Sequence, residues 1–392
     1  MSARIDELLE AAVAAGTVPG VVTVAAGRDG VRHEGTAGRL SVDGDTPVGP
    51  DTIFRIASMT KAITTVAALQ LVEQGRLELD QPVTSVAGAF GELQVLDGFE
   101  GIEPRLRAPA NQATIRQLMS HSAGVGYRFL NEDLTRYQQL TGLPDLLTGE
   151  KKGLLGMPLA SDPGTRWEYG MSVDWLGQVI EAVTGQGLDE VLTEHVLAPL
   201  GMIDTSFAPT DEQRARLMPI HARTPDGGLA ATELGWPPAP EFWPGGHGLY
   251  GTAGDYLRFL RALLAGGELD GARILAPETV ELMFKPQLGD LALPDIIRTA
   301  DPELTNDIQA LPVRQTWGLG LQLVLEDLPG MRRAGTGNWA GLCNSYYWID
   351  RASGVTGAIF TQVLPFFDAR IVELAGGFEQ EVYAAVGAAA TA

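Results

Sequence analysis

The two ends of the chain carry hydrophobic patterns typical of strands, and the middle carries patterns typical of helices. Segments 20–27 and 31–38 are apolar or alternate with polar residues, and a turn at Asp29-Gly30 joins them, which predicts a β-hairpin. Further apolar segments predict strands near the C-terminus: 317–324, 344–350 and 354–363. Strands that frame a mostly helical middle predict an antiparallel sheet with helices on its faces.

Helical periodicity predicts a deeply buried helix from Ser58 to about Gln74. Another helix is expected to begin at Ser172, as its N-cap residue, and to end at Gly185. Residues 84–112 and 203–247 contain scattered Gly and Pro without clear periodicity, so we expect irregular segments that shape a cleft.

This order of elements predicts an α/β fold of the α+β type in two parts. The sheet domain is expected to comprise residues 1–85 and 250–392. A mainly helical domain with long cleft-lining loops is expected to be inserted between them, at residues 86–249. We expect the active site in the cleft between the two domains, where ligand sites are common.

Charge narrows the range of partners. The formal net charge is −21, which argues against a nucleic acid or an anionic membrane surface as a partner. Acids at Asp6, Glu7 and Glu10 interrupt the first helix where a secretory leader would be apolar. No segment approaches the roughly 18 uncharged apolar residues of a membrane span. A cytoplasmic location is the expectation, and the oligomeric state stays open.

Candidate metal and thiol chemistry finds no support. The five histidines lack metal-ligand spacing, so we expect neither a metal nor a cofactor. Cys343 is the only cysteine, which rules out an internal disulfide, and we expect a small buried residue there. The G-x-G-x-x-G match at 246–251 follows Trp-Pro-Gly-Gly instead of a buried strand, which favours a turn over a dinucleotide site.

The strongest chemical signal is the pair Ser58 and Lys61. A spacing of three residues places both on one helical face, one turn apart. A serine hydroxyl becomes a good nucleophile when a base takes its proton, and a lysine acts as that base when its surroundings lower its pKa. Lysine is scarce in this chain, and Lys61 lies in an apolar helix where an unneeded charge would be costly.

Several motifs resemble the serine β-lactamase and penicillin-binding-protein superfamily. These are Phe54-Arg-Ile-Ala-Ser-Met-Thr-Lys61, Ile115-Arg-Gln-Leu-Met-Ser-His-Ser-Ala-Gly124 and Pro163-Gly-Thr-Arg-Trp-Glu-Tyr-Gly170. They occur in the family order over nearly the whole chain. Within the superfamily the sequence is most similar to family VIII carboxylesterases. The resemblance implies a class C β-lactamase-like fold: an antiparallel sheet flanked by helices, plus an all-helical domain.

The resemblance also implies roles for Tyr169 and Met171. Tyr169 matches the tyrosine that shares protons with the serine and lysine, whereas without the resemblance a tyrosine packed before a helix is the simpler interpretation. Met171 stands where lactam-cleaving relatives usually have an asparagine that holds a substrate amide. We expect Met171 to contact substrate. Because the asparagine is missing, hydrolysis of a lactam or a peptide is a weaker hypothesis.

Residues 334–341 align with the third family motif. Gly335-Thr336-Gly337 replaces the usual Lys-Thr-Gly, so the cation that attracts a substrate carboxylate is missing. Trp339-Ala-Gly341 resembles the Trp-Gly-Gly signature of the esterases, which makes Trp339 and Gly341 expected substrate contacts. The backbone N–H of Trp339, or of Asn338 if the register shifts by one, is expected to form the oxyanion hole with that of Ser58. Core packing is the competing interpretation of Trp339.

His247 completes the expected site, because its glycine-rich turn should face the cleft and bring it to the substrate. The sequence thus predicts a serine carboxylesterase with Ser58, Lys61 and Tyr169 as catalytic residues and a small-molecule ester as substrate. Three alternatives stay open. They are hydrolysis of an amide or β-lactam (β-lactamase, D-peptidase or oligomer amidase), acyl transfer to a small-molecule acceptor, and a non-catalytic binding or sensor role.

Overall fold

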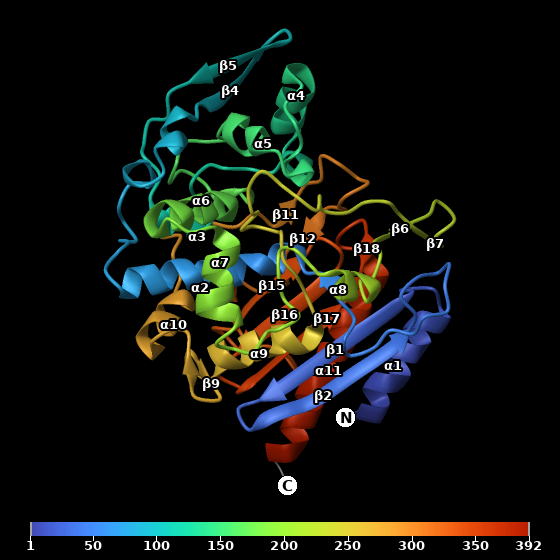
Figure 1. Ribbon diagram of the computed structural model, residues 1–392. Coiled ribbons are helices and arrows are strands. Elements are labelled where there is room, and N and C mark those ends of the chain that lie inside the picture. The colour runs from blue at the N-terminus through green and yellow to red at the C-terminus, as the bar shows by residue number, and fades with distance from the viewer. Residues whose placement is uncertain (1, 391–392) are drawn as a thin grey trace.

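A seven-stranded antiparallel sheet forms the centre of the computed structural model, which describes residues 2–390 (Figure 1). The strand order is β13-β14-β15-β16-β17-β1-β2. Because β1 pairs with β17, with Val22 opposite Phe360, strands from both ends of the chain lie side by side, as the sequence predicts. The strand bounds are β1 Gly20–Gly27, β2 Gly30–Gly38, β13 Gln315–Trp317, β14 Gln322–Val324, β15 Gly337–Gly341, β16 Ser345–Asp350 and β17 Val355–Phe360.

Helices cover both faces of the sheet. Val21 and Ala25 of β1 point into a core shared with α1 (Ser2–Ala14) and α11 (Ala369–Ala390), the two terminal helices. The alternate residues Val22 and Val24 point into the larger core on the other face, against α2 and α9. The period of two along a strand therefore explains why β1 is buried throughout. The inner helices are α2 Thr60–Glu73 and α9 Ala253–Leu264.

The middle of the chain folds above one end of the sheet, around short helices and small ribbons (Figure 1). The helices are α3 Ile115–Met119, α4 Glu132–Thr141, α5 Lys151–Gly156, α6 Ser172–Thr184, α7 Leu188–Leu192 and α8 Asp211–Ala215, and α10 Pro277–Met283 lies outside this region. The strands outside the main sheet come from all parts of the chain and are β3 Phe54–Arg55, β4 Val95–Glu100, β5 Glu103–Arg107, β6 His221–Arg223, β7 Leu229–Ala231, β8 Tyr250–Gly251, β9 Glu268–Leu269, β10 Ala272–Arg273, β11 Ile296–Ile297, β12 Ile308–Gln309 and β18 Val363–Leu364. The domain boundaries at residues 85 and 250 stay a prediction.

Four local expectations are wrong. Residues 203–247 contain helix α8 and the paired strands β6 and β7, which are too short to give a clear periodicity. Residues 84–112 contain the β4–β5 hairpin, whose bulged register hides the alternation of its apolar residues. Segment 317–324 is two strands, because Gly320, with φ of 74°, turns the chain back so that Trp317 pairs with Gln322. Ser172 is the first helical residue of α6 instead of its N-cap, and its side chain caps nothing.

In the part of the chain that the structure describes, no helix is both long enough and apolar enough to cross a membrane.

Candidate active site

Ser58 lies in a tight turn that leads from the short strand β3 into the buried helix α2. The turn is the 3₁₀ segment Ala57–Met59, and β3 is held by pairing with β8. Ala57 has φ of 46°, a left-handed conformation that costs a non-glycine residue about 1 kcal/mol. This conformation reverses the chain directly before Ser58, which is half-buried at the start of the helical segment.

Lys61 is the centre of the site. Its side chain is 1% exposed, and its Nζ donates hydrogen bonds to Ser58 Oγ at 3.0 Å, Tyr127 OH at 3.1 Å and the carbonyl oxygen of Gly246 at 2.7 Å. Three acceptors match the three N–H groups of an ammonium, so a charged Lys61 is fully satisfied in a buried place. The predicted proximity of Ser58 and Lys61 is confirmed.

A polar wall, which we define as Tyr127, Asp174 and Gly246, lies behind Lys61. Asp174 is 0% exposed, and its Oδ1 accepts the N–H of Gly246 at 2.9 Å. A Cβ on Gly246 would lie 2.4 Å from Asp174 Oδ2, so only glycine allows this approach. His247 Nδ1 lies 3.4 Å from Asp174 Oδ1. One buried carboxylate thus organises the turn that holds the lysine.

An aromatic wall, made of Tyr169, Trp339, Trp317 and His121, lies on the other side. The ring centroid of Tyr169 is 4.8 Å from Lys61 Nζ, and its hydroxyl accepts a 2.8 Å hydrogen bond from Trp339 Nε1. Trp317 packs edge-on against Trp339 at 4.6 Å, and the His121 ring lies 4.7 Å from that of Tyr169. These contacts fix the Tyr169 phenol beside Ser58 and Lys61, although no hydrogen bond joins Tyr169 to either of them in the described residues.

The two tyrosines next to Lys61 have different surroundings. Burial, and then the nearby Asp174 carboxylate, raise the pKa of Tyr127 well above its ordinary value. Tyr127 therefore stays neutral and serves as a hydrogen-bond partner. Tyr169 instead receives an N–H donor on its oxygen, which would stabilise a developing phenolate.

Ser58 opens into a small pocket, called the Ser58 pocket below, that brings most of the predicted residues together. Tyr127, Tyr169, His247, Trp339 and Gly341 line it beside Ser58. Its remaining walls are largely apolar and include Phe129, Leu130, Leu147 and Phe366. No lysine or arginine lines the pocket, so a neutral acyl group suits it better than a carboxylate-bearing one.

Strand β15 forms one edge of the Ser58 pocket. A Cβ on Gly341 would lie 2.6 Å from the Ile56 carbonyl oxygen, so glycine lets β15 approach the Ser58 turn closely. Trp339 lines the Ser58 pocket, whereas Asn338 does not, and the Asn338 side-chain amide donates to the Gln322 carbonyl oxygen. This favours Trp339 over Asn338 as the second oxyanion donor, and that role stays a prediction.

Met171 and Cys343 lie outside the Ser58 pocket. Met171 is 2% exposed and is the N-cap residue of α6, so the structure does not place it against a substrate. Its side chain packs in the main hydrophobic core instead. Cys343 is buried, as predicted, and burial raises the pKa of its thiol to about 12, so it stays protonated at neutral pH.

Sequence reasoning missed Tyr127 and Asp174. Asp174 gave a usable signal, because an acid in the apolar run Val173-Asp174-Trp175-Leu176 is costly unless it has a function. Tyr127 gave none, since its contact with Lys61 depends on the path of the loop before α4. In residues 2–390, no cluster of three His, Cys, Asp or Glu side chains is arranged to hold a metal ion.

Comparisons with known proteins identify the family of the chain. The family model described as Beta-lactamase matches residues 5–375. The chain belongs to the β-lactamase family. It is 33% identical to lovastatin esterase of Penicillium rubens, over 97% of this chain and 98% of that protein. It is also 33% identical to monacolin J acid methylbutanoyltransferase of Aspergillus terreus, over 86% of this chain and 83% of the transferase.

Solved structures give the same fold for this family member. A mutant of simvastatin synthase (LovD) from Aspergillus terreus superposes with a TM-score of 0.86 and 30% identity, covering 98% of this chain and 97% of the synthase. EstCE1, a hydrolase with promiscuous acyltransferase activity, has a TM-score of 0.77 at 23% identity, covering 97% and 98% of the two chains, and supports the fold alone. This enzyme of the β-lactamase fold therefore has both esterases and acyltransferases among its relatives.

Proposed function

We propose that the protein hydrolyses neutral carboxylic esters through an acyl-enzyme on Ser58. The observation that carries this proposal is the buried Lys61, which joins Ser58 Oγ to a neutral tyrosine and a backbone carbonyl. The uncharged, apolar Ser58 pocket favours an ester over a carboxylate-bearing lactam. The 33% identity to lovastatin esterase supports the same bond type.

In the proposed reaction, the Lys61 ammonium first releases a proton to solvent, and the resulting amine accepts the Ser58 proton as Oγ attacks the ester carbonyl carbon. The resulting oxyanion is held by the backbone N–H groups of Ser58 and Trp339. As the tetrahedral intermediate collapses, Tyr169 donates its proton to the departing alkoxide and regains one from Lys61. Water then attacks the acyl-enzyme, with the same groups acting in reverse, and releases the acid and Ser58.

The decisive test is an ester screen with matched serine variants. We expect hydrolysis of p-nitrophenyl esters, a loss of about 10⁴-fold or more for Ser58→Ala, and labelling of Ser58 by an alkyl phosphonate. Ser172→Ala is the control, because Ser172 is buried nearby and its Oγ has no hydrogen-bond partner in the described residues. An unlabelled Ser58 with no turnover would support a binding or sensor protein instead.

Acyl transfer is the second candidate, because the monacolin J acid methylbutanoyltransferase is 33% identical over 86% of this chain. The apolar walls of the Ser58 pocket also disfavour bulk water. Adding acceptor alcohols to the ester assay and measuring new esters by mass spectrometry distinguishes the two reactions. A chromogenic cephalosporin assayed in parallel tests the amide alternative, and faster lactam turnover would reject ester specificity.

A further inference from the structure

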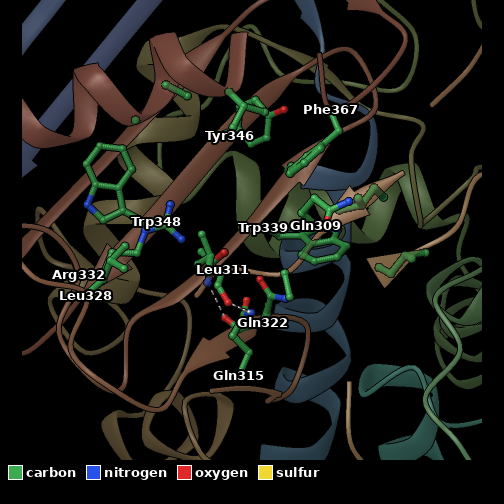
Figure 2. A pocket seen from close by; sticks show the side chains of 18 of the residues that line it. Gln309, Leu311, Gln315, Gln322, Leu328, Arg332, Trp339, Tyr346, Trp348 and Phe367 are labelled. Atoms are coloured by element: carbon green, nitrogen blue, oxygen red, sulfur yellow. Dashed lines mark hydrogen bonds between the residues drawn. The ribbon is translucent and has the colours of Figure 1, made fainter. Parts of the chain in front are cut away.

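A second cavity, called the side pocket below, lies next to the Ser58 pocket, on the face of the sheet that α11 covers. Ala340, Tyr346 and Trp348 from the sheet form its floor, and Ala375 and Gly376 of α11 form one side. Figure 2 shows Trp339 and Gln309 at one end of the side pocket and Trp348, Arg332 and Leu328 at the other. Its volume is about 220 Å³, against about 40 Å³ for the Ser58 pocket.

The lining of the side pocket suits a neutral, apolar ligand. Its only ion pair is internal: Arg332 and Glu379 make two parallel contacts of 2.8 and 2.9 Å, with side chains 12% and 4% exposed. That geometry neutralises both charges and leaves neither for a ligand. The remaining polar groups are mainly amides, such as those of Gln309 and Gln322, which suit an occasional carbonyl or hydroxyl.

The two pockets share a wall. Ile308, Trp339, Ala340 and Phe366 line both of them. Trp339 is held in place by its hydrogen bond to Tyr169 and its packing on Trp317. A molecule with its reactive carbonyl at Ser58 therefore has the side pocket next to it, across the side chains of Ile308, Trp339 and Phe366.

We infer that the side pocket binds the apolar, non-reacting tail of the substrate, an inference that rests on the proposed ester chemistry. The Ser58 pocket alone has room for a short acyl group, and the side pocket accommodates a long or bulky neutral chain. The chain belongs to either the acid or the alcohol half of the ester, since both halves offer the same chemistry. Burial of methylenes there favours long esters over acetates.

Gly376 offers a clean way to fill the side pocket. A Cβ at this position would meet no atom within 4 Å, and the residue lies inside helix α11. Gly376→Phe therefore projects a ring into the side pocket and replaces a poor helix former. Gly376→Leu is the smaller second variant, should the ring hinder folding. Gln380→Phe places the same ring on the exposed face of α11 and is the matched control.

The kinetic experiment compares two ester series. The acid arm is p-nitrophenyl acetate against p-nitrophenyl decanoate, and the alcohol arm is methyl acetate against decyl acetate. We expect Gly376→Phe to lower kcat/KM about tenfold or more for the long ester of one arm. The same variant should leave kcat/KM for p-nitrophenyl acetate and for methyl acetate within about twofold of wild type. Equal effects on long and short esters, or none, would overturn the inference.

A binding experiment separates failure of the side pocket from failure of the proposed function. Methyl decanoate and decyl acetate are titrated into Ser58→Ala protein and followed by tryptophan fluorescence, since Trp339 and Trp348 line the side pocket. We expect saturable binding of at least one ester, lost with Gly376→Phe and kept with Gln380→Phe. Binding that survives Gly376→Phe rejects the inference. If Gly376→Phe abolishes binding but the wild-type protein hydrolyses no ester, only the proposed function is rejected.

Discussion

The two walls around Lys61 are built from opposite chemistry. The polar wall buries a carboxylate, a phenol and a backbone turn and connects them by hydrogen bonds. The aromatic wall packs four rings at tilted or edge-on angles, and a single N–H reaches the tyrosine oxygen. The two walls have different roles: the polar wall holds the lysine by hydrogen bonds, and the aromatic wall positions a phenol.

The polar wall carries the larger physical cost. Asp174 is 0% exposed and accepts one backbone hydrogen bond, although a carboxylate can accept several. Burying such a charge is unfavourable unless an opposite charge lies nearby. Gly246 joins the two groups, because its N–H bonds to Asp174 and its carbonyl oxygen accepts from the Lys61 amine. The aromatic wall has no comparable desolvation cost, because its rings would pack well in any core.

The largest expected effect comes from removing the amine itself. We expect Lys61→Met to lower kcat for p-nitrophenyl acetate by about 10³-fold or more, because Ser58 loses its proton acceptor. Methionine keeps the length and the apolar stem of the lysine. Steady-state kinetics measures the loss, and circular dichroism checks the fold. Near-normal turnover would show that neither wall acts through the lysine.

Removing the charge of the polar wall should have an intermediate effect. Asp174→Asn keeps an acceptor for the Gly246 N–H but removes the buried negative charge near Tyr127 and the Gly246 turn, and we expect kcat to fall about tenfold or more with KM little changed. As a positioning residue, Asp174 should also shift the pH profile of kcat.

Asp255→Asn is the control for Asp174→Asn, since Asp255 is a buried carboxylate outside the Ser58 pocket that accepts hydrogen bonds from Asp204 N and Thr205. An equal loss in the two variants would mean that both act through stability, and the proposed role of Asp174 would be wrong.

The aromatic wall should respond more mildly. Trp339→Phe removes the donor to the Tyr169 hydroxyl, a hydrogen bond worth about 1 kcal/mol, so we expect kcat to fall about fivefold. In a double-mutant cycle with Tyr169→Phe the two losses should be less than additive. Strict additivity would show that Trp339 acts as pocket wall alone.

The smallest expected effect is on stability against pH. Burial, and then the charge of Lys61, hold the pKa of His121 well below its usual 6.5. In the unfolded chain this histidine binds a proton near pH 6.5, so the native state binds fewer protons just below that pH. The contribution of His121 to the free energy of unfolding should therefore be fully present above pH 6.5 and should decrease as the pH falls below that value.

Urea unfolding at pH 8, 7, 6 and 5.5 measures this slope. His121→Asn should flatten it, since asparagine tolerates the φ of 54° and cannot titrate. Part of the slope should persist in the variant, because burial also lowers the pKa of His33 and His221. An unchanged slope would show that the aromatic wall contributes nothing to the pH dependence.

The sequence predicts the local part of the candidate site well and the distant part poorly. Ser58 and Lys61 meet because three residues make nearly one helical turn, a relation that the sequence displays directly. Tyr127 meets Lys61, and Asp174 meets Gly246, through a loop and a glycine turn whose paths depend on the whole fold. Tyr169 was found by the resemblance, and its Trp339 partner depends on the placement of β15.

The same contrast holds for the fold. The nearly continuous apolar run of residues 20–27 predicts β1 correctly, because that strand is buried on both faces. The β4–β5 hairpin, in contrast, is mostly exposed, and a bulge interrupts its register between Leu96 and Phe99. Where burial does not constrain the side chains, alternation in the sequence is too weak to reveal a strand.

The pairing of β1 with β17 also affects how the protein is made. On the ribosome the β1–β2 hairpin and the Ser58 helix emerge first, while β15 and β17 are still to be translated. At usual elongation rates the delay is roughly tens of seconds, during which β1 presents an open edge that invites aggregation and chaperone binding. A nascent or prematurely terminated chain has Ser58 and Lys61 but lacks the strand beside them, so we expect it to be inert.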